Sequence, residues 1–232
     1  MKISGIVFDM DGVLLDTERI SEQAWHAAAE KTASPEAGAM YAVCTGMTMP
    51  KIRAALEERT GTECASAFLA AWNGEFDRIA ARGGIPAMPF AQETLAALQG
   101  RYRLALASST FSGRVRPQLE AAGLLRFFEV LVTGDMVQNG KPDPEIYLRA
   151  CSALDLPPES CVAVEDSPNG IASAFAAGLK PVMIPDRIKP DAETLSRLWR
   201  RCASLREFAQ IAQKGFAPEN SCAGDLDVFS VR

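Results

Sequence analysis

The chain has 232 residues, of which 48% are hydrophobic and 23% are charged, and its formal net charge is −5. These values predict an ordinary globular protein with one large domain, or a domain with a smaller insert, and exclude a wholly disordered chain, a collagen and a coiled coil. The acidic balance argues against nucleic acid or an anionic membrane as partner, although local positive charge can still bind a small anion.

The residue types narrow the chemistry further. The apolar run that ends before Asp9 is too short for a signal-peptide core or a membrane span, so we expect a cytoplasmic protein. The six cysteines form no CxxC pair, which predicts reduced thiols packed as small apolar residues. The single histidine, His26, falls in a helix-like stretch and no GxSxG motif occurs, so a serine triad is not supported. A carboxylate remains as the main candidate nucleophile.

Short apolar runs alternate with helix-like segments along most of the chain. The runs, each typical of a strand buried on both faces, are 4–8, 103–107, 130–132, 161–164 and 181–184. The helical segments of this part are 90–98, 113–122, 144–154 and 169–177. This alternation predicts an α/β fold with an open, Rossmann-like parallel sheet.

The alternation of strands and helices is interrupted between the first two runs. There the sequence shows helical periodicity near 24–30, 50–59 and 65–81, and it indicates no strand. A crossover of this length predicts an inserted α-helical domain. We therefore expect a core domain made of 1–16 and 85–214, a helical domain at 17–84, and a loosely ordered tail at 215–232.

Polar residues follow four of the predicted strands. They are Asp9-Met10-Asp11-Gly12, Ser108-Ser109-Thr110, a loop leading to Gly140-Lys141-Pro142, and Glu165-Asp166-Ser167. Parallel strands bring their carboxyl ends to one edge, where ligands of such sheets bind. Each cluster alone could be a turn or helix cap, but all four together favour a functional site.

Four carboxylates at one edge predict a divalent cation, because like charges this close oppose each other's ionisation. Oxygen ligands without imidazole or thiolate point to Mg²⁺. The lysine and the hydroxyls suit an anion brought to the metal, for which a phosphate is the obvious candidate.

The motifs DMDGV, the serine after LALAS, the lysine of GKPDP and VEDSPNGI resemble, in order and spacing, the four motifs of the haloacid dehalogenase (HAD) superfamily. The insertion after the first motif is similar to the helical cap of its phosphatase and β-phosphoglucomutase-like branch. The resemblance extends to about Ile211 and implies a HAD-like core with a cap.

The resemblance implies a role for each matched residue. Asp9 would be the nucleophile that forms an aspartyl-phosphate, and Asp11 the general acid and base. Ser108 would bind the phosphoryl group, Lys141 would offset negative charge, and Ser109 and Thr110 would be secondary contacts or turn residues. The metal would be held by Asp9, the backbone carbonyl of Asp11 and Asp166, with support from Glu165. Asp16 and Thr17 would form the hinge to the cap.

The presence of Asp11 favours phosphoryl transfer over dehalogenation, and we expect a Mg²⁺-dependent phosphatase of a small phosphorylated metabolite such as a sugar phosphate. A β-phosphoglucomutase-like mutase is the main alternative. It is weakened because Ser21 stands where such a mutase would carry a histidine, and Met49 where it would carry an arginine. A non-catalytic phosphate-responsive module and a degenerate binding protein are further alternatives. The sequence leaves the oligomeric state open and is compatible with a monomer.

Overall fold

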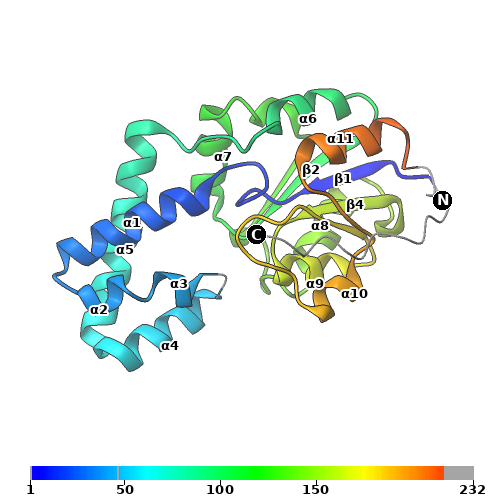
Figure 1. Cartoon of the computed structure of the whole chain (residues 1–232). Coiled ribbons are helices and arrows are strands. Elements are labelled where there is room, and N and C mark those ends of the chain that lie inside the picture. The colour runs from blue at the N-terminus through cyan, green and yellow to red at the C-terminus, as the bar shows by residue number, and fades with distance from the viewer. Residues whose placement is uncertain (1, 46, 217–232) are drawn as a thin grey trace, which may run out of the picture.

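The computed structural model describes residues 2–45 and 47–216; the predicted tail lies outside these residues except for 215 and 216. Its centre is a six-stranded, fully parallel sheet in the order β3-β2-β1-β4-β5-β6 (Figure 1). The strands are β1 Gly5–Phe8, β2 Arg103–Ser108, β3 Val130–Thr133, β4 Cys161–Glu165, β5 Lys180–Met183 and β6 Arg200–Arg201. The predicted α/β class is confirmed, and the five predicted strands lie where the apolar runs stand.

Burial on both faces explains why the strands lack strict polar and apolar alternation. In the central strand β1, Ile6 and Phe8 face one hydrophobic cluster while Val7 faces another, and all three are fully buried. The helices that cover the sheet are α6 Ala91–Leu98, α7 Ser112–Ala121, α8 Glu145–Ala153, α9 Pro168–Ala176 and α11 Leu205–Gln213, and α10 Ala192–Arg197 packs against α9. Apolar residues of α6, α7 and α11 belong to the first cluster, and those of α8 and α9 to the second. The result is a three-layer arrangement with the sheet in the middle (Figure 1).

Between β1 and α6 the chain forms a separate group of helices, on the left of Figure 1. They are α1 Thr17–Lys31, α2 Pro35–Gly38, α3 Tyr41–Cys44, α4 Met49–Thr60 and α5 Thr62–Gly83. This group has its own hydrophobic cluster around Trp25, Leu56 and Phe68, all nearly inaccessible to solvent. An independent core is what a separate domain requires. The domain boundaries stay a prediction, which this packing supports.

The two connections between sheet and helical group run side by side. The backbone N–H of Asp16 donates to the carbonyl of Pro86 at 2.9 Å, and that of Met88 donates to Leu14 at 2.9 Å. Asp16 also begins α1, because its side chain accepts from the N–H of Arg19 at 3.4 Å. The predicted hinge at Asp16 and Thr17 therefore lies where the chain leaves the sheet.

Sequence patterns did not indicate the short elements α2, α3, α10 and β6, nor α11 and the 3-10 helices Leu125–Phe127, Gly134–Met136 and Pro158–Ser160. Most of these span fewer residues than are needed to display a period. In the described part of the chain, no helix is both long enough and apolar enough to cross a membrane.

Candidate active site

The predicted polar clusters meet at the carboxyl edge of the sheet. Asp9 follows β1, Ser108 ends β2, and Glu165 ends β4. Lys141 reaches the same place from the loop before α8. The backbone N–H of Asp9 donates to the carbonyl of Val164 at 2.9 Å, which fixes the nucleophile candidate beside the end of β4.

Lys141 is the electrostatic centre of this edge. Its Nζ donates to Asp9 Oδ1 at 2.6 Å, to Glu165 Oε1 at 2.6 Å and to the carbonyl of Ala107 at 3.0 Å. The three charged side chains are almost completely buried. Burial alone would lower the pKa of Lys141, but Asp9 and Glu165 raise it well above its ordinary value. The lysine is therefore a permanent cation between two carboxylates.

Glu165 is held by more donors than sequence reasoning indicated. The hydroxyl of Tyr147 in α8 donates to Glu165 Oε1 at 2.8 Å, and that of Ser167 donates to Oε2 at 3.1 Å. Gly170, in the first turns of α9, lies so close that an added Cβ would fall 1.9 Å from the carboxyl carbon of Glu165. The packing of α8 and α9 thus fixes this carboxylate in one position.

Three carboxylates form a cluster suited to a metal. Ligand oxygens of Asp9, Glu165 and Asp166 all lie within 4.8 Å of one another. Burial raises the pKa of Asp166 well above its ordinary value, and the charges of Glu165 and Asp9 raise it further. The pKa of Asp9 is raised by burial too, against the opposing effect of Lys141. A hard divalent cation would stabilise these carboxylates in their charged form, so the residues present fit the metal that the fold implies.

The side chain of Asp11 is not part of this carboxylate cluster and faces the hydroxyls of β2 and of the loop after it. Ser108 Oγ donates to Asp11 Oδ2 at 3.2 Å, and Thr110 Oγ1 donates to the same oxygen at 3.0 Å. Burial raises the pKa of Asp11, although these hydrogen bonds oppose the shift. Gly12 follows with φ +77°, and an added Cβ there would lie 2.4 Å from Asp166 Oδ2. The turn therefore needs glycine both for its conformation and for its approach to the cluster.

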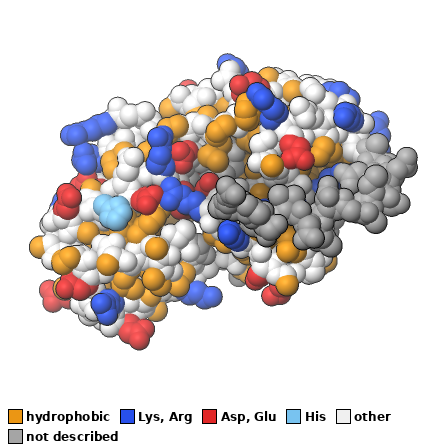
Figure 2. Space-filling view, in the orientation of Figure 1, with side chains coloured by type: hydrophobic (Ala, Val, Ile, Leu, Met, Phe, Trp, Pro, Cys, Tyr) orange, Lys and Arg blue, Asp and Glu red, His pale blue; other side chains and the backbone are white. Residues whose placement is uncertain are grey.

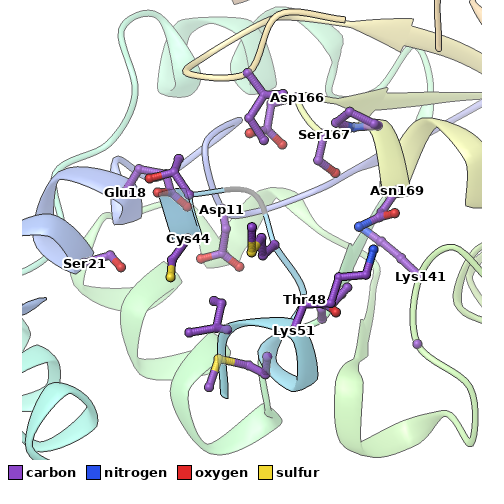
Figure 3. Close-up of a pocket in the computed structure, with 18 of the residues that line it drawn as sticks. Asp11, Glu18, Ser21, Cys44, Thr48, Lys51, Lys141, Asp166, Ser167 and Asn169 are labelled. Carbon is purple, nitrogen blue, oxygen red and sulfur yellow. The ribbon is translucent and has the colours of Figure 1, made fainter. Parts of the chain in front are cut away.

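A cavity of about 760 Å³ lies over this edge, between the sheet and the helical group. Its core side includes Asp9, Asp11, Ser109 and Lys141, and residues of α1, α3 and α4 line the other side. Figure 3 shows Glu18 and Ser21 facing the cavity from α1, and Lys51 reaching into it from α4. Ser108 itself is fully buried beneath the cavity.

Four large side chains of the helical group separate into two sets. Trp25 and Trp72 line the cavity, whereas Arg53 and Arg78 form ion pairs with Glu57 and Glu75 of their own helices. The single histidine, His26, is exposed on the outer surface of α1 (Figure 2), so it takes no part in the cluster.

A buried lysine and a group of carboxylates under a large cavity are suited to an enzyme that handles a small anion. Over residues 3–178 the chain matches the haloacid dehalogenase-like hydrolase family, and it belongs to that family. It is 34% identical to the phosphorylated carbohydrates phosphatase of Thermotoga maritima, with 78% of this chain and 84% of the relative covered. It is 33% identical to protein CbbY of Rhodobacter capsulatus, with 86% and 93% covered.

Solved structures agree with these sequence matches. CbbY of Rhodobacter sphaeroides in complex with xylulose-1,5-bisphosphate superposes with a TM-score of 0.70 and 27% identity, covering 88% of this chain and 96% of the other. β-Phosphoglucomutase of Clostridium difficile shares the fold, with a TM-score of 0.69, 21% identity, and 92% and 98% covered. The predicted family, fold class and phosphoric monoester hydrolase activity are confirmed, and the superfamily's general use of a divalent metal agrees with the carboxylate cluster.

Proposed function

We propose that the protein hydrolyses a small phosphomonoester, such as a sugar phosphate, with Mg²⁺ as its metal and Asp9 as its nucleophile. The position of Lys141 between Asp9 and Glu165, with Asp166 close by and a cavity above, carries this proposal. The names of the relatives support the substrate class, since one is a phosphatase of phosphorylated carbohydrates and another was solved with a sugar bisphosphate.

In the first step a carboxylate oxygen of Asp9 attacks phosphorus, and the bond to the leaving oxygen breaks. Asp11 donates its proton to that oxygen, and its raised pKa favours the protonated form that this needs. Asp11 then takes a proton from water, whose oxygen attacks phosphorus and releases phosphate and free Asp9. Ser109 lines the cavity and would bind the phosphoryl oxygens directly. Lys141 would offset their charge, because its three N–H groups already donate to Asp9, Glu165 and Ala107. Ser108 would bind a phosphoryl oxygen by exchanging its hydrogen bond to Asp11.

Asp9, Asp166 and the backbone carbonyl of Asp11 would hold Mg²⁺, with Glu165 as support. When bound, the ion neutralises carboxylate charge and positions the phosphoryl group beside Asp9. Both oxygens of Glu165 already accept hydrogen bonds: Oε1 from Lys141 and Tyr147, and Oε2 from the hydroxyl of Ser167 and the backbone N–H groups of Asp166 and Ser167. This favours a supporting role for Glu165 over that of a direct ligand.

The test is a panel of small phosphomonoesters that includes sugar phosphates, phosphoglycolate and nucleotides, assayed with and without Mg²⁺ beside Asp9→Asn. We expect Mg²⁺-dependent phosphate release by the wild type and none by the variant. Release from none of the compounds would refute the substrate class. Equal activity of Asp9→Asn would refute the nucleophile.

The mutase remains a second candidate because a β-phosphoglucomutase shares the fold. Ser21 lines the cavity in place of the expected histidine, and Met49 stands in place of the expected arginine. Neither residue can supply the imidazole or guanidinium that such a mutase would use. A coupled assay that follows isomerisation of β-glucose 1-phosphate with a bisphosphate activator separates the two activities.

A further inference from the structure

Asp135 is an exposed carboxylate that has no part in the mechanism above. It lies in the 3-10 helix Gly134–Met136, directly after β3, and does not line the cavity. Its side chain nevertheless joins two loops at the carboxyl edge of the sheet. Oδ1 accepts from the backbone N–H of Ser112 at 2.8 Å and from the hydroxyl of Thr133 at 2.6 Å, and Oδ2 accepts from the hydroxyl of Ser112 at 2.6 Å.

These three hydrogen bonds keep Asp135 charged. The donors of Ser112 and Thr133 lower the pKa of Asp135 below its ordinary value, so the side chain is ionised at neutral pH. Hydrogen bonds to a charged acceptor are shorter and stronger than those between neutral groups. Ser112 is the first residue of α7, so its N–H has no acceptor within the helix, and Asp135 supplies one from another loop. The carboxylate therefore ties the start of α7 to the end of β3.

The segment 109–111 between β2 and α7 is held at both ends by these contacts. At one end, Ser108 pairs with Thr133 in the parallel register of β2 and β3. At the other end, Asp135 holds Ser112. A segment of three residues that is fixed at both ends has few other conformations, so the end of β3 determines its course.

Gly134 fixes the middle of the same segment. Its N–H donates to the carbonyl of Thr110 at 3.0 Å, and an added Cβ would lie 2.2 Å from the carbonyl oxygen of Ser109. A shift of the 3-10 helix would therefore move the backbone of Ser109 directly. Because Ser109 lines the cavity and Thr110 donates to Asp11 at 3.0 Å, the same shift would displace a phosphoryl contact and the general acid.

We propose that Asp135 is a positioning residue for phosphoryl transfer, which holds the segment 109–111 in the geometry that the transition state needs. This inference rests on the proposed phosphatase function and adds a residue outside the cavity to it. Donors stabilise a transition state best when they are in place before the reaction, and a displacement of about 1 Å can cost about 100-fold in rate. A carboxylate at the start of a helix also stabilises the helix, but that role alone would not distinguish the ground state from the transition state.

The experiment measures kcat and KM for p-nitrophenyl phosphate with Mg²⁺, and the inhibition constants of inorganic phosphate and orthovanadate. Vanadate can adopt the five-coordinate geometry of the transition state, whereas phosphate resembles the ground state, so the ratio of their constants reports how well the site fits the transition state. We expect Asp135→Ala to lower kcat by roughly 10- to 100-fold with little change in KM. Vanadate inhibition should weaken by a similar factor relative to phosphate inhibition.

Two further variants and a control separate positioning from stability. Asp135→Asn should stay within about threefold of the wild type, because its amide oxygen still accepts from Ser112 and Thr133. Ser112→Ala removes one of the three hydrogen bonds and should lie between the wild type and Asp135→Ala; it decides the question if Asp135→Ala folds poorly. Ser204→Ala is the control, since Ser204 accepts from the N–H of Glu207 at the start of α11, next to the strand at the far edge of the sheet from β3. It should lower the melting temperature and leave kcat and both inhibition constants unchanged.

An Asp135→Ala variant with the kcat and the inhibition ratio of the wild type would overturn the positioning role, whatever its melting temperature. Equal weakening of vanadate and phosphate would also overturn it, because it would indicate general damage to the site. A wild type that hydrolyses neither p-nitrophenyl phosphate nor any ester of the wider panel would instead refute the proposed function on which the inference rests.

Discussion

Lys141→Met removes the one ammonium group that joins Asp9 to Glu165. The lysine side chain is 6% exposed, and those of its two partners are 9% and 0% exposed, so water cannot replace the lost charge. Breaking a buried ion pair by removing one partner costs about 3–5 kcal/mol, because the remaining charge is left unpaired. We expect Lys141→Met to lose this much free energy of unfolding in the absence of metal, and to lose at least about 100-fold in kcat through weaker stabilisation of the phosphoryl charge.

Urea unfolding at neutral pH with a chelator measures the stability loss. Lys31→Met is the matched control: its ammonium pairs with Glu75 at 3.1 Å, but its side chain is 61% exposed, so we expect a much smaller loss. A midpoint for Lys141→Met equal to that of the control, with an unchanged slope, would refute the inference that the buried lysine compensates the two carboxylates.

Further predictions concern the carboxylate cluster and its packing. Asp166→Asn should raise the Mg²⁺ concentration for half-maximal activity by more than about tenfold, because it removes a charged ligand; an unchanged requirement would exclude Asp166 as ligand. Mg²⁺ should raise the melting temperature of the wild type and not of Asp166→Asn, since only an intact site couples binding to folding; equal shifts would contradict this. Gly170→Ala should destabilise the protein by about 1–3 kcal/mol, because its Cβ would overlap Glu165. Gly74→Ala, where an added Cβ meets nothing within 4 Å, should be neutral or stabilising, and equal effects of the two substitutions would refute the packing argument.

The core of the site could be predicted because its residues follow short apolar strands. Asp9, Ser108 and Glu165 each stand at the end of such a strand, and a parallel sheet puts all these ends on one edge. They become neighbours because β1 lies between β2 and β4. The order itself, with β1 between β2 and β4, depends on the packing of helices far apart in the sequence and carries no local signal.

The sequence does not predict which side chains of different helices, strands and loops contact each other in the site. Tyr147 looks like an ordinary apolar-face residue of α8, and only the packing of that helix on the sheet brings its hydroxyl to Glu165. The sequence predicts Thr110 as a secondary phosphate contact or a turn residue, and only the structure reveals that its hydroxyl donates to Asp11.

The central claim is that catalysis passes through a phosphorylated Asp9. Acid-quenched Asp11→Asn protein, mixed with p-nitrophenyl phosphate and Mg²⁺, can be digested and mapped by mass spectrometry. This ester has a good leaving group that needs little protonation, while hydrolysis of the intermediate lacks its base. We expect phosphate on Asp9 in this variant and none in Asp9→Asn. Turnover without phosphate on Asp9, or phosphate on another residue, would contradict the account.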